Sequence, residues 1–237
     1  MADPAQRDAV EALLGHRFAN PALLDEALTH RSALYERHSR KRDEKRGAGS
    51  NERLEFVGDR VLGLLVAEWL VERFPDEQEG DLGPRLAYLV SRVTLALIAE
   101  AAGLSQALSI AAGDARAGVG GQATVLADAI EAVLGAVYMD AGLEPARRFV
   151  RRAWAAAMEA HPRPPKDPKT LLQEWLMARG EALPHYAVAG QEGPPHAPNF
   201  RVEVAAHGFT GAGVGPSKRL AEREAATDLL LKLGAPP

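Results

Sequence analysis

Carboxylates recur at helical spacing within two apolar segments of the chain. One segment carries Glu52, Glu55 and Asp59 at positions i, i+3 and i+7, and the other carries Asp128 and Glu131 at i and i+3. At about 3.6 residues per turn, such offsets return to nearly the same side of a helix. The surrounding residues otherwise favour a core. We therefore expect two largely buried helices, each with an acidic stripe.

Buried carboxylates need a partner of opposite charge. Arg53 and Arg60 are adjacent to the acids in sequence, and we expect them to point elsewhere. Brought together, the acids would repel one another and raise their own pKa values unless cations lay between them. The chain has no cysteine, and no histidine follows these acids at i+3. Thiolate sites and the Glu-x-x-His di-iron pattern are therefore excluded.

A site built only from oxygen ligands predicts a hard dication, Mg²⁺, with Mn²⁺ able to substitute. Such a site suits phosphoryl chemistry, in which a metal activates water and stabilises the leaving oxygen of a phosphodiester. The spacing favours Asp59 and Glu131 for metal or catalytic roles. Glu52 lies in the first turn, where the helix dipole favours an acid in any case, so a helix-start role stays open beside a ligand role. Glu79, in an acidic turn, would by itself be a solvated residue.

The composition is that of a globular chain. It has 237 residues, of which 46% are hydrophobic, enough for one large domain or two smaller ones. The formal net charge of -4 gives no global basic field, so any binding of nucleic acid must rest on local patches. The absence of cysteine is compatible with a reducing cytosol. We find no secretory signal and no apolar run long enough to span a membrane, and expect a cytoplasmic protein with no membrane partner.

Hydrophobic periodicity predicts two domains of different class. Residues 1–160 fit an all-α domain, residues 161–167 a proline-rich linker, and residues 168–237 a small α+β domain of order α-β-β-β-α. The predicted helices of the first domain are 5–15, one opening at 20–21, the acidic segment from 51 up to Pro75, 86–102, 124–140 with Thr124 as N-cap, and 144–160, with a loop or broken helix at 109–123. The predicted elements of the second are helices at 170–179 and 217–233 and strands at 185–189, 200–206 and 209–214. A basic run at 36–50 is interpreted as a solvated loop, with RNA contact as the alternative.

Two motifs resemble a known family. They are NERLEFVGD at 51–59 and LADAIEAVLGAVYMD at 126–140. Together with the segment 27–32, the turn at 79–81 and the second domain, they closely resemble bacterial ribonuclease III, a double-strand-specific endoribonuclease. The resemblance implies a Mg²⁺-dependent homodimer, without a nucleotide cofactor, in which Phe56 packs across the dimer. Its substrates would be double-stranded regions of ribosomal RNA precursors and other structured transcripts, cut to leave 5′-phosphate and 3′-hydroxyl ends with short 3′ overhangs.

The resemblance also implies roles for single residues of the first domain. Four acids match the family's metal-binding and catalytic set: Glu55, Asp59, Asp128 and Glu131. Among them Asp59 and Glu131 would bear most directly on hydrolysis. Glu52 and Glu79 match accessory acids near the cleavage site, and His30 is expected to be structural rather than catalytic.

The second domain resembles a double-stranded RNA-binding domain. The residues that the resemblance assigns to RNA are Gln173, Glu174, His196, Ser217, Lys218 and Arg219. The first two would enter a minor groove and touch 2′-hydroxyls, and the histidine lies in a loop that would reach the next minor groove. The last three begin a helix, where backbone N–H groups, the helix dipole and two cations would converge on phosphates of the intervening major groove. Such contacts read A-form shape rather than sequence.

The sequence departs from the family pattern outside the acid set. The departures are the long basic insertion at 36–50 and the residues Leu86, Val93, Val119, Gly121 and Gln122. Two other functions remain as alternatives. A non-catalytic double-stranded RNA-binding protein would need only the second domain, but it has no use for buried acids. An all-α nucleotide pyrophosphohydrolase also pairs acids on helices, but it leaves residues 168–237 without a role.

Overall fold

The computed structural model describes residues 4–38, 49–161, 167–194 and 198–235. The chain divides into two compact units, residues 1–164 and 165–237, and each is described by itself. The first unit is helical and the second combines helices with a sheet, so the predicted fold class is confirmed. The central part of the basic run at 36–50 lies outside the described residues.

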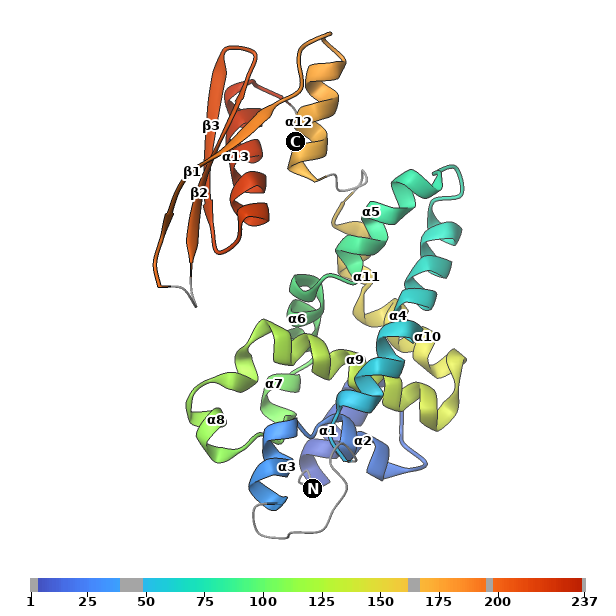
Figure 1. Cartoon of the computed structure of the whole chain (residues 1–237). Helices are drawn as coiled ribbons and strands as arrows, with labels where there is room; N and C mark the ends of the chain where they lie inside the picture. The colour runs from blue at the N-terminus through green and yellow to red at the C-terminus, as the bar shows by residue number, and fades with distance from the viewer. Residues whose placement is uncertain (1–3, 39–48, 162–166, 195–197, 236–237) are drawn as a thin grey trace. The chain divides into compact units, whose positions relative to one another are not determined.

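Helices of very different length build the first unit (Figure 1). In the described part of the chain they are α1 (Pro4–Leu14), α2 (Pro21–Ala27), α3 (Arg31–His38), α4 (Glu52–Arg73), α5 (Glu79–Leu89), α6 (Arg92–Ala101), α7 (Leu104–Ala107), α8 (Ala112–Arg116), the 3-10 turn η1 (Val119–Gly121), α9 (Ala123–Ala141), α10 (Leu143–Ala153) and α11 (Ala155–Glu159). The short helices α3 and α7 were not predicted, because they are too brief to show a hydrophobic period.

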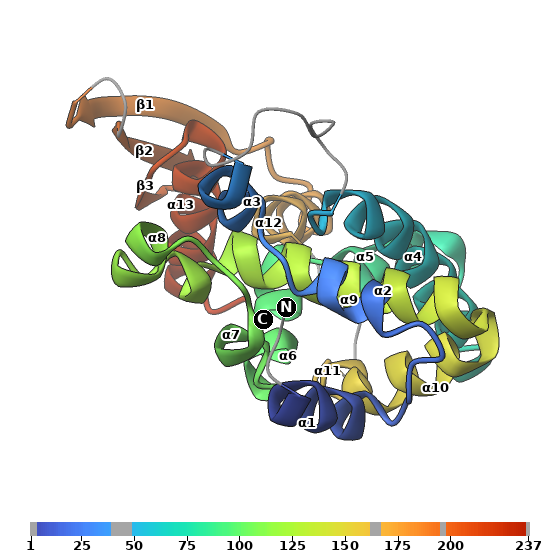
Figure 2. The ribbon, with the colours of Figure 1, turned by 90° about the horizontal axis from the view of Figure 1, so that it is seen from below.

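Helix α9 forms the centre of the first unit, with α2, α4, α6 and α10 packed against it (Figure 2). Its side chains at Ile130, Val133, Leu134 and Val137 have no exposed surface. Residues 132–137 of α9 are all buried, so this stretch is apolar on every side and is surrounded by other helices. The most extensive of these contacts is with α4, which supplies another group of buried side chains: Leu54, Val61, Leu62, Leu65, Val66 and Leu70.

Two glycines allow the backbones of α4 and α9 to touch. A Cβ atom on Gly58 would lie 1.8 Å from the carbonyl oxygen of Glu131. A Cβ on Gly135 would lie 2.1 Å from the carbonyl oxygen of Leu54. Neither position has space for any side chain, so both glycines are required by packing. Gly135 and its alanine neighbours are small residues of the kind that let another helix approach closely, whereas Gly58 lies among larger residues.

Several predicted helix boundaries were wrong. The continuous helix at 86–102 is broken between α5 and α6, which meet at a bend of 48°. Ser91 causes the break, because its side chain accepts the Thr94 backbone N–H as the N-cap of α6. The helix at 144–160 is broken at buried Trp154, whose indole N–H donates to the Leu89 carbonyl at 3.0 Å. Thr124 is not an N-cap, because α9 begins one residue earlier.

The described helices were compared with the length and composition that a membrane span requires. Among the described helices, none alone is long and apolar enough to cross a membrane. The bent pair α5 and α6 passes the test only when the two helices are taken together.

The second unit has the predicted order of elements. They are α12 (Pro168–Met177), β1 (His185–Glu192), β2 (Asn199–Ala206), β3 (Phe209–Gly215) and α13 (Lys218–Lys232). The strands form one antiparallel sheet in the order β1-β2-β3, with a register shift near Gly190. Val202 and Val204 alternate with exposed residues along β2 and pack with Leu172 and Leu176 of α12, as the period-2 pattern predicted.

Small residues bring α13 close to the sheet. A Cβ on Gly213 would lie 2.2 Å from the backbone nitrogen of Ala225, and one on Gly211 would lie 2.4 Å from its carbonyl oxygen. Ala221 and Ala225 are fully buried at this contact. Ser217 precedes the helix and accepts the Leu220 backbone N–H, so the N-terminus of α13 is held in place by packing and by a cap.

Replacing Gly58 or Gly135 with alanine should destabilise the first unit. Each new methyl group would overlap a backbone carbonyl and force α4 and α9 apart, lowering the free energy of unfolding by about 1–3 kcal/mol or more. Denaturant unfolding measures the loss. Gly80→Ala is the matched control, because its Cβ meets open space within a helix. Equal stability of Gly58→Ala and Gly80→Ala would contradict the backbone contact.

Candidate active site

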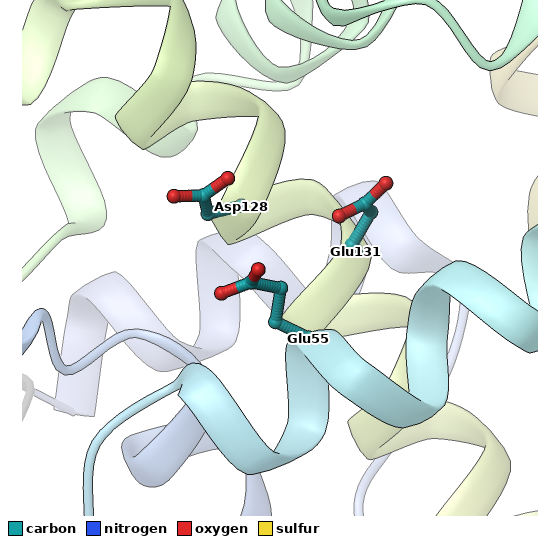
Figure 3. A group of neighbouring side chains, drawn as sticks. All are labelled: Glu55, Asp128 and Glu131. Atoms are coloured by element: carbon teal, nitrogen blue, oxygen red, sulfur yellow. The ribbon is translucent and has the colours of Figure 1, made fainter.

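Three predicted acids gather where α4 and α9 cross. Glu55 comes from α4, and Asp128 and Glu131 come from successive turns of α9 (Figure 3). One carboxylate oxygen from each lies within 4.8 Å of the others. The segments are far apart in sequence, so the tertiary fold creates the cluster. The predicted convergence of two acidic helices is therefore present in the structure.

The acids face an open pocket rather than a closed interior. The pocket has a volume of about 940 Å³. Glu55, Asp59, Asp128 and Glu131 all line it, and each is only partly buried. The expectation that the acidic stripe lies in the core was wrong in this respect, because the buried face of α4 is the neighbouring face that carries Leu54, Val61 and Leu65. The space is large enough for a hydrated cation and a phosphate together.

The acids destabilise one another's charged forms. Burial, and then the charges of Glu55 and Asp128, raise the pKa of Glu131 from 4.5 to about 7. Burial, and then Asp128 and Glu52, raise the pKa of Glu55. Burial also raises the pKa of Asp128, against the opposing effect of nearby arginines. Repulsion between the acids therefore raises their pKa values as the sequence predicted, although removal from water contributes more to the rise. A bound dication would relieve both costs.

Asp59 lines the same pocket but stands apart from the cluster of three. Its carboxylate pairs with the guanidinium of Arg60, so the expectation that Arg60 points elsewhere was wrong. The arginine side chain is long enough to fold back onto its neighbour, and its guanidinium carbon lies 5.3 Å from the centre of the Phe56 ring. Arg60 therefore occupies one of the two oxygens of the Asp59 carboxylate, Oδ2.

The two accessory acids differ in their placement. Glu52 lines the pocket, accepts a hydrogen bond from Ser50 Oγ at 3.1 Å and lies 3.7 Å from Arg31. Glu79 is the exposed first residue of α5 and is not part of the pocket lining within the described chain. The structure of one chain therefore brings Glu52, but not Glu79, to the acid cluster.

Sequence reasoning missed several pocket residues. His30, Arg31, Asn51 and Asp114 line the pocket together with the acids. Burial, and then Arg31, lower the pKa of His30, which favours its neutral form at pH 7. Three of the four had a signal in the sequence, because His30 and Arg31 lie in the segment 27–32 and Asn51 begins the motif at 51–59, and both stretches carried the family resemblance. Asp114 had none, since it comes from the short helix α8.

The predicted RNA-binding residues of the second unit lie on two helices. Gln173 and Glu174 are exposed on α12. Lys218 and Arg219 are exposed in the first turn of α13, directly after the capping Ser217. This geometry leaves both cations and the helix N-terminus available to a phosphate. The last predicted residue, His196, lies outside the described residues.

Comparison with known proteins agrees with both units. A family model described as Ribonuclease-III-like matches residues 20–157, and one described as Double-stranded RNA binding motif matches residues 168–233. Ribonuclease 3 of Rhodopseudomonas palustris is 45% identical over 227 residues, covering 95% of this chain and 80% of that protein. Ribonuclease 3 of Caulobacter vibrioides is 45% identical over 230 residues, covering 95% of each. The solved nuclease domain of ribonuclease III from Campylobacter jejuni matches with a TM-score of 0.56 and 32% identity, covering 65% of this chain and 99% of that chain.

The acid site and the two folds define a metal-dependent nuclease joined to a module that binds double-stranded RNA. The chain belongs to the ribonuclease III family.

The raised pKa of Glu131 predicts a stability that depends on pH. Between pH 4.5 and about 7, the folded metal-free chain keeps a proton on Glu131 that the unfolded chain has released. The free energy of unfolding should therefore fall as pH rises through this window. Glu131→Gln should unfold at a higher temperature than the parent chain at pH 8 in EDTA, and at a similar temperature at pH 5. Exposed Glu100→Gln is the control and should show no such gain. If Glu131→Gln raised the unfolding temperature equally at pH 5 and pH 8, the raised pKa of Glu131 would be contradicted.

Proposed function

We propose that this chain is a Mg²⁺-dependent endoribonuclease that hydrolyses phosphodiester bonds in double-stranded RNA and leaves 5′-phosphate and 3′-hydroxyl ends. The observation that carries the proposal is the cluster of Glu55, Asp128 and Glu131, with oxygens within 4.8 Å, in a pocket of a ribonuclease III fold. A protein that only binds RNA would gain nothing from three mutually repelling acids, so the non-catalytic alternative is not favoured.

The donor set fits a hard dication. Glu55, Asp128 and Glu131 would hold Mg²⁺, and Mn²⁺ could replace it, because both accept carboxylate oxygens. The bound ion would activate water and stabilise the leaving oxygen. Asp59 would complete the site once Arg60 turns away, and its carboxylate, with Glu131, would orient the water. Glu52 would act at the edge of the same pocket.

Residues 1–160 would cleave the RNA, and residues 168–237 would bind the duplex. Lys218 and Arg219 would bind phosphates at the N-terminus of α13, with Ser217 fixing that end of the helix. Gln173 and Glu174 on α12 would touch a minor groove, and His196 would reach the next one. The substrates would be ribosomal RNA precursors and other structured transcripts in the cytoplasm.

A second copy of the chain would complete the enzyme. Phe56, Leu64 and Val71 follow one another along α4 and are 67%, 56% and 60% exposed. Large apolar side chains in a row indicate a protein interface. The Campylobacter jejuni domain is described as having a flexible region involved in dimer formation. We propose a homodimer through this face of α4, in which Glu79 acts on the active site of the partner.

Asp59→Asn and Glu131→Gln should each lower cleavage of a perfect RNA duplex in Mg²⁺ by at least about a hundredfold. Each change keeps the shape of the side chain but removes the charge. Binding of the same duplex in Ca²⁺, which tolerates looser geometry, should stay within about threefold. Asp76→Asn makes the same chemical change in an exposed turn and should cleave normally. Normal cleavage by either active-site variant would refute the assignment.

Lys218→Ala and Arg219→Ala should weaken RNA binding through lost phosphate contacts. Each should reduce the slope of log affinity against log salt concentration by about one. Anisotropy titrations of a labelled duplex at several salt concentrations in Ca²⁺ give the slope. Lys232→Ala is the control, because this lysine lies in the last turn of α13 and is bonded to Thr210 and Asp228. An unchanged slope for both variants would remove α13 from the interface.

A further inference from the structure

The active-site pocket contains hydrogen-bond donors that the proposed catalysis does not use. His30, Arg31 and Asn51 line it beside the acids. His30 is firmly held from behind: its backbone N–H donates to the carbonyl of Ser109 at 3.0 Å, and its carbonyl accepts the N–H of Ala33 at 3.0 Å. A side chain fixed this way at the wall of a reactive pocket is well placed to orient a ligand.

The contacts of the His30 ring favour one tautomer. The backbone N–H of Ser32 donates to Nδ1 at 3.3 Å, so Nδ1 carries a lone pair. The hydroxyl oxygen of Ser32 accepts the N–H of Ala111 at 3.2 Å and lies 2.9 Å from the same Nδ1, so the hydroxyl proton is free to point at the ring. A neutral imidazole with an accepting Nδ1 bears its proton on Nε2.

Two donors of this pocket lack acceptors. Within the described chain, His30 Nε2 makes no hydrogen bond. Asn51 is only 2% exposed, and its Nδ2 has no hydrogen-bond partner there either. An unpaired buried donor such as Asn51 Nδ2 costs free energy and is found where a ligand supplies the missing acceptor, whereas half-buried His30 Nε2 can also reach water. The pocket is therefore lined by two kinds of side chain. Its carboxylates suit a cation, and its hydrogen-bond donors suit the acceptor oxygens of a ligand.

We propose that His30 is a substrate-binding residue, donating Nε2–H to a non-bridging oxygen of the RNA phosphate held in this pocket. The inference rests on the proposed function, since it names the group of the substrate that His30 contacts. A role as metal ligand would also use Nε2, because Nδ1 faces Ser32, and the Mn²⁺ measurement below separates it from phosphate binding. A purely structural role would use Nδ1 alone and would leave Nε2 without purpose.

Two amide substitutions separate these roles. The amide nitrogen of His30→Gln lies near the position of Nε2, whereas His30→Asn places an amide group near the position of Nδ1. If Nε2 binds phosphate, His30→Gln should cleave duplex RNA within about threefold of the parent chain. His30→Asn should lose about tenfold to a hundredfold in kcat/KM, chiefly through KM, as expected for one lost hydrogen bond to a charged group. Mn²⁺ affinity, measured by electron paramagnetic resonance, should be unchanged in both.

The reverse order, with His30→Asn active and His30→Gln impaired, would overturn the proposal and assign His30 a structural role through Ser32. Weaker Mn²⁺ binding in His30→Asn would also overturn it. If the parent chain itself failed to cleave duplex RNA in Mg²⁺, the proposed function would fall, irrespective of either variant. If the variants do not fold, nitrogen NMR of the His30 ring in the parent chain tests the proposal instead. We expect a protonated Nε2 whose signal moves when duplex RNA is added in Ca²⁺. A protonated Nδ1 would refute the inference.

Discussion

The contact between the backbones of α4 and α9 at Gly58 and Gly135 determines the geometry of the site. Gly58 lies one turn beyond Glu55, and Gly135 lies one turn beyond Glu131. Because each glycine touches a carbonyl of the other helix, the acids are brought together one turn from the crossing. Any wider helix spacing would separate Glu55 from Asp128 and Glu131 by more than a single ion can bridge. The active site is thus a consequence of helix packing.

This geometry has a cost in stability. Three carboxylates held within 4.8 Å and partly withdrawn from water favour their protonated forms, most clearly at Glu131, with its pKa of about 7. The apolar core around α9 offsets the penalty, and a cation would remove it. Arg60 relieves part of it at Asp59. The metal-free site is therefore a strained arrangement that favours binding of a dication.

The sequence predicted what depends on local periodicity and missed what depends on tertiary contacts. The i, i+3 spacing of Asp128 and Glu131 indicated that both lie on one side of a helix, because helical offsets are fixed by geometry. Their meeting with Glu55 was inferred from the need of buried acids for a shared cation. The alternation along β2 indicated the sheet, because offsets along a strand are equally fixed. The pairing of Arg60 with Asp59 and the absence of Glu79 from the pocket could not be foreseen, since rotamers and distant packing decide them. The break at Ser91 was readable as an N-cap, but a continuous apolar pattern concealed it.

The two units carry different charged groups. Acids lie at a helix crossing in the first unit, and Lys218 and Arg219 lie at a helix N-terminus in the second. The account depends on the three acids binding a single cation. Anomalous diffraction from crystals of the full chain soaked in Mn²⁺ tests this directly. We expect a strong peak at coordination distance from oxygens of Glu55, Asp128 and Glu131. A peak elsewhere, or none while the three carboxylates keep their present positions at pH 8, would contradict the account.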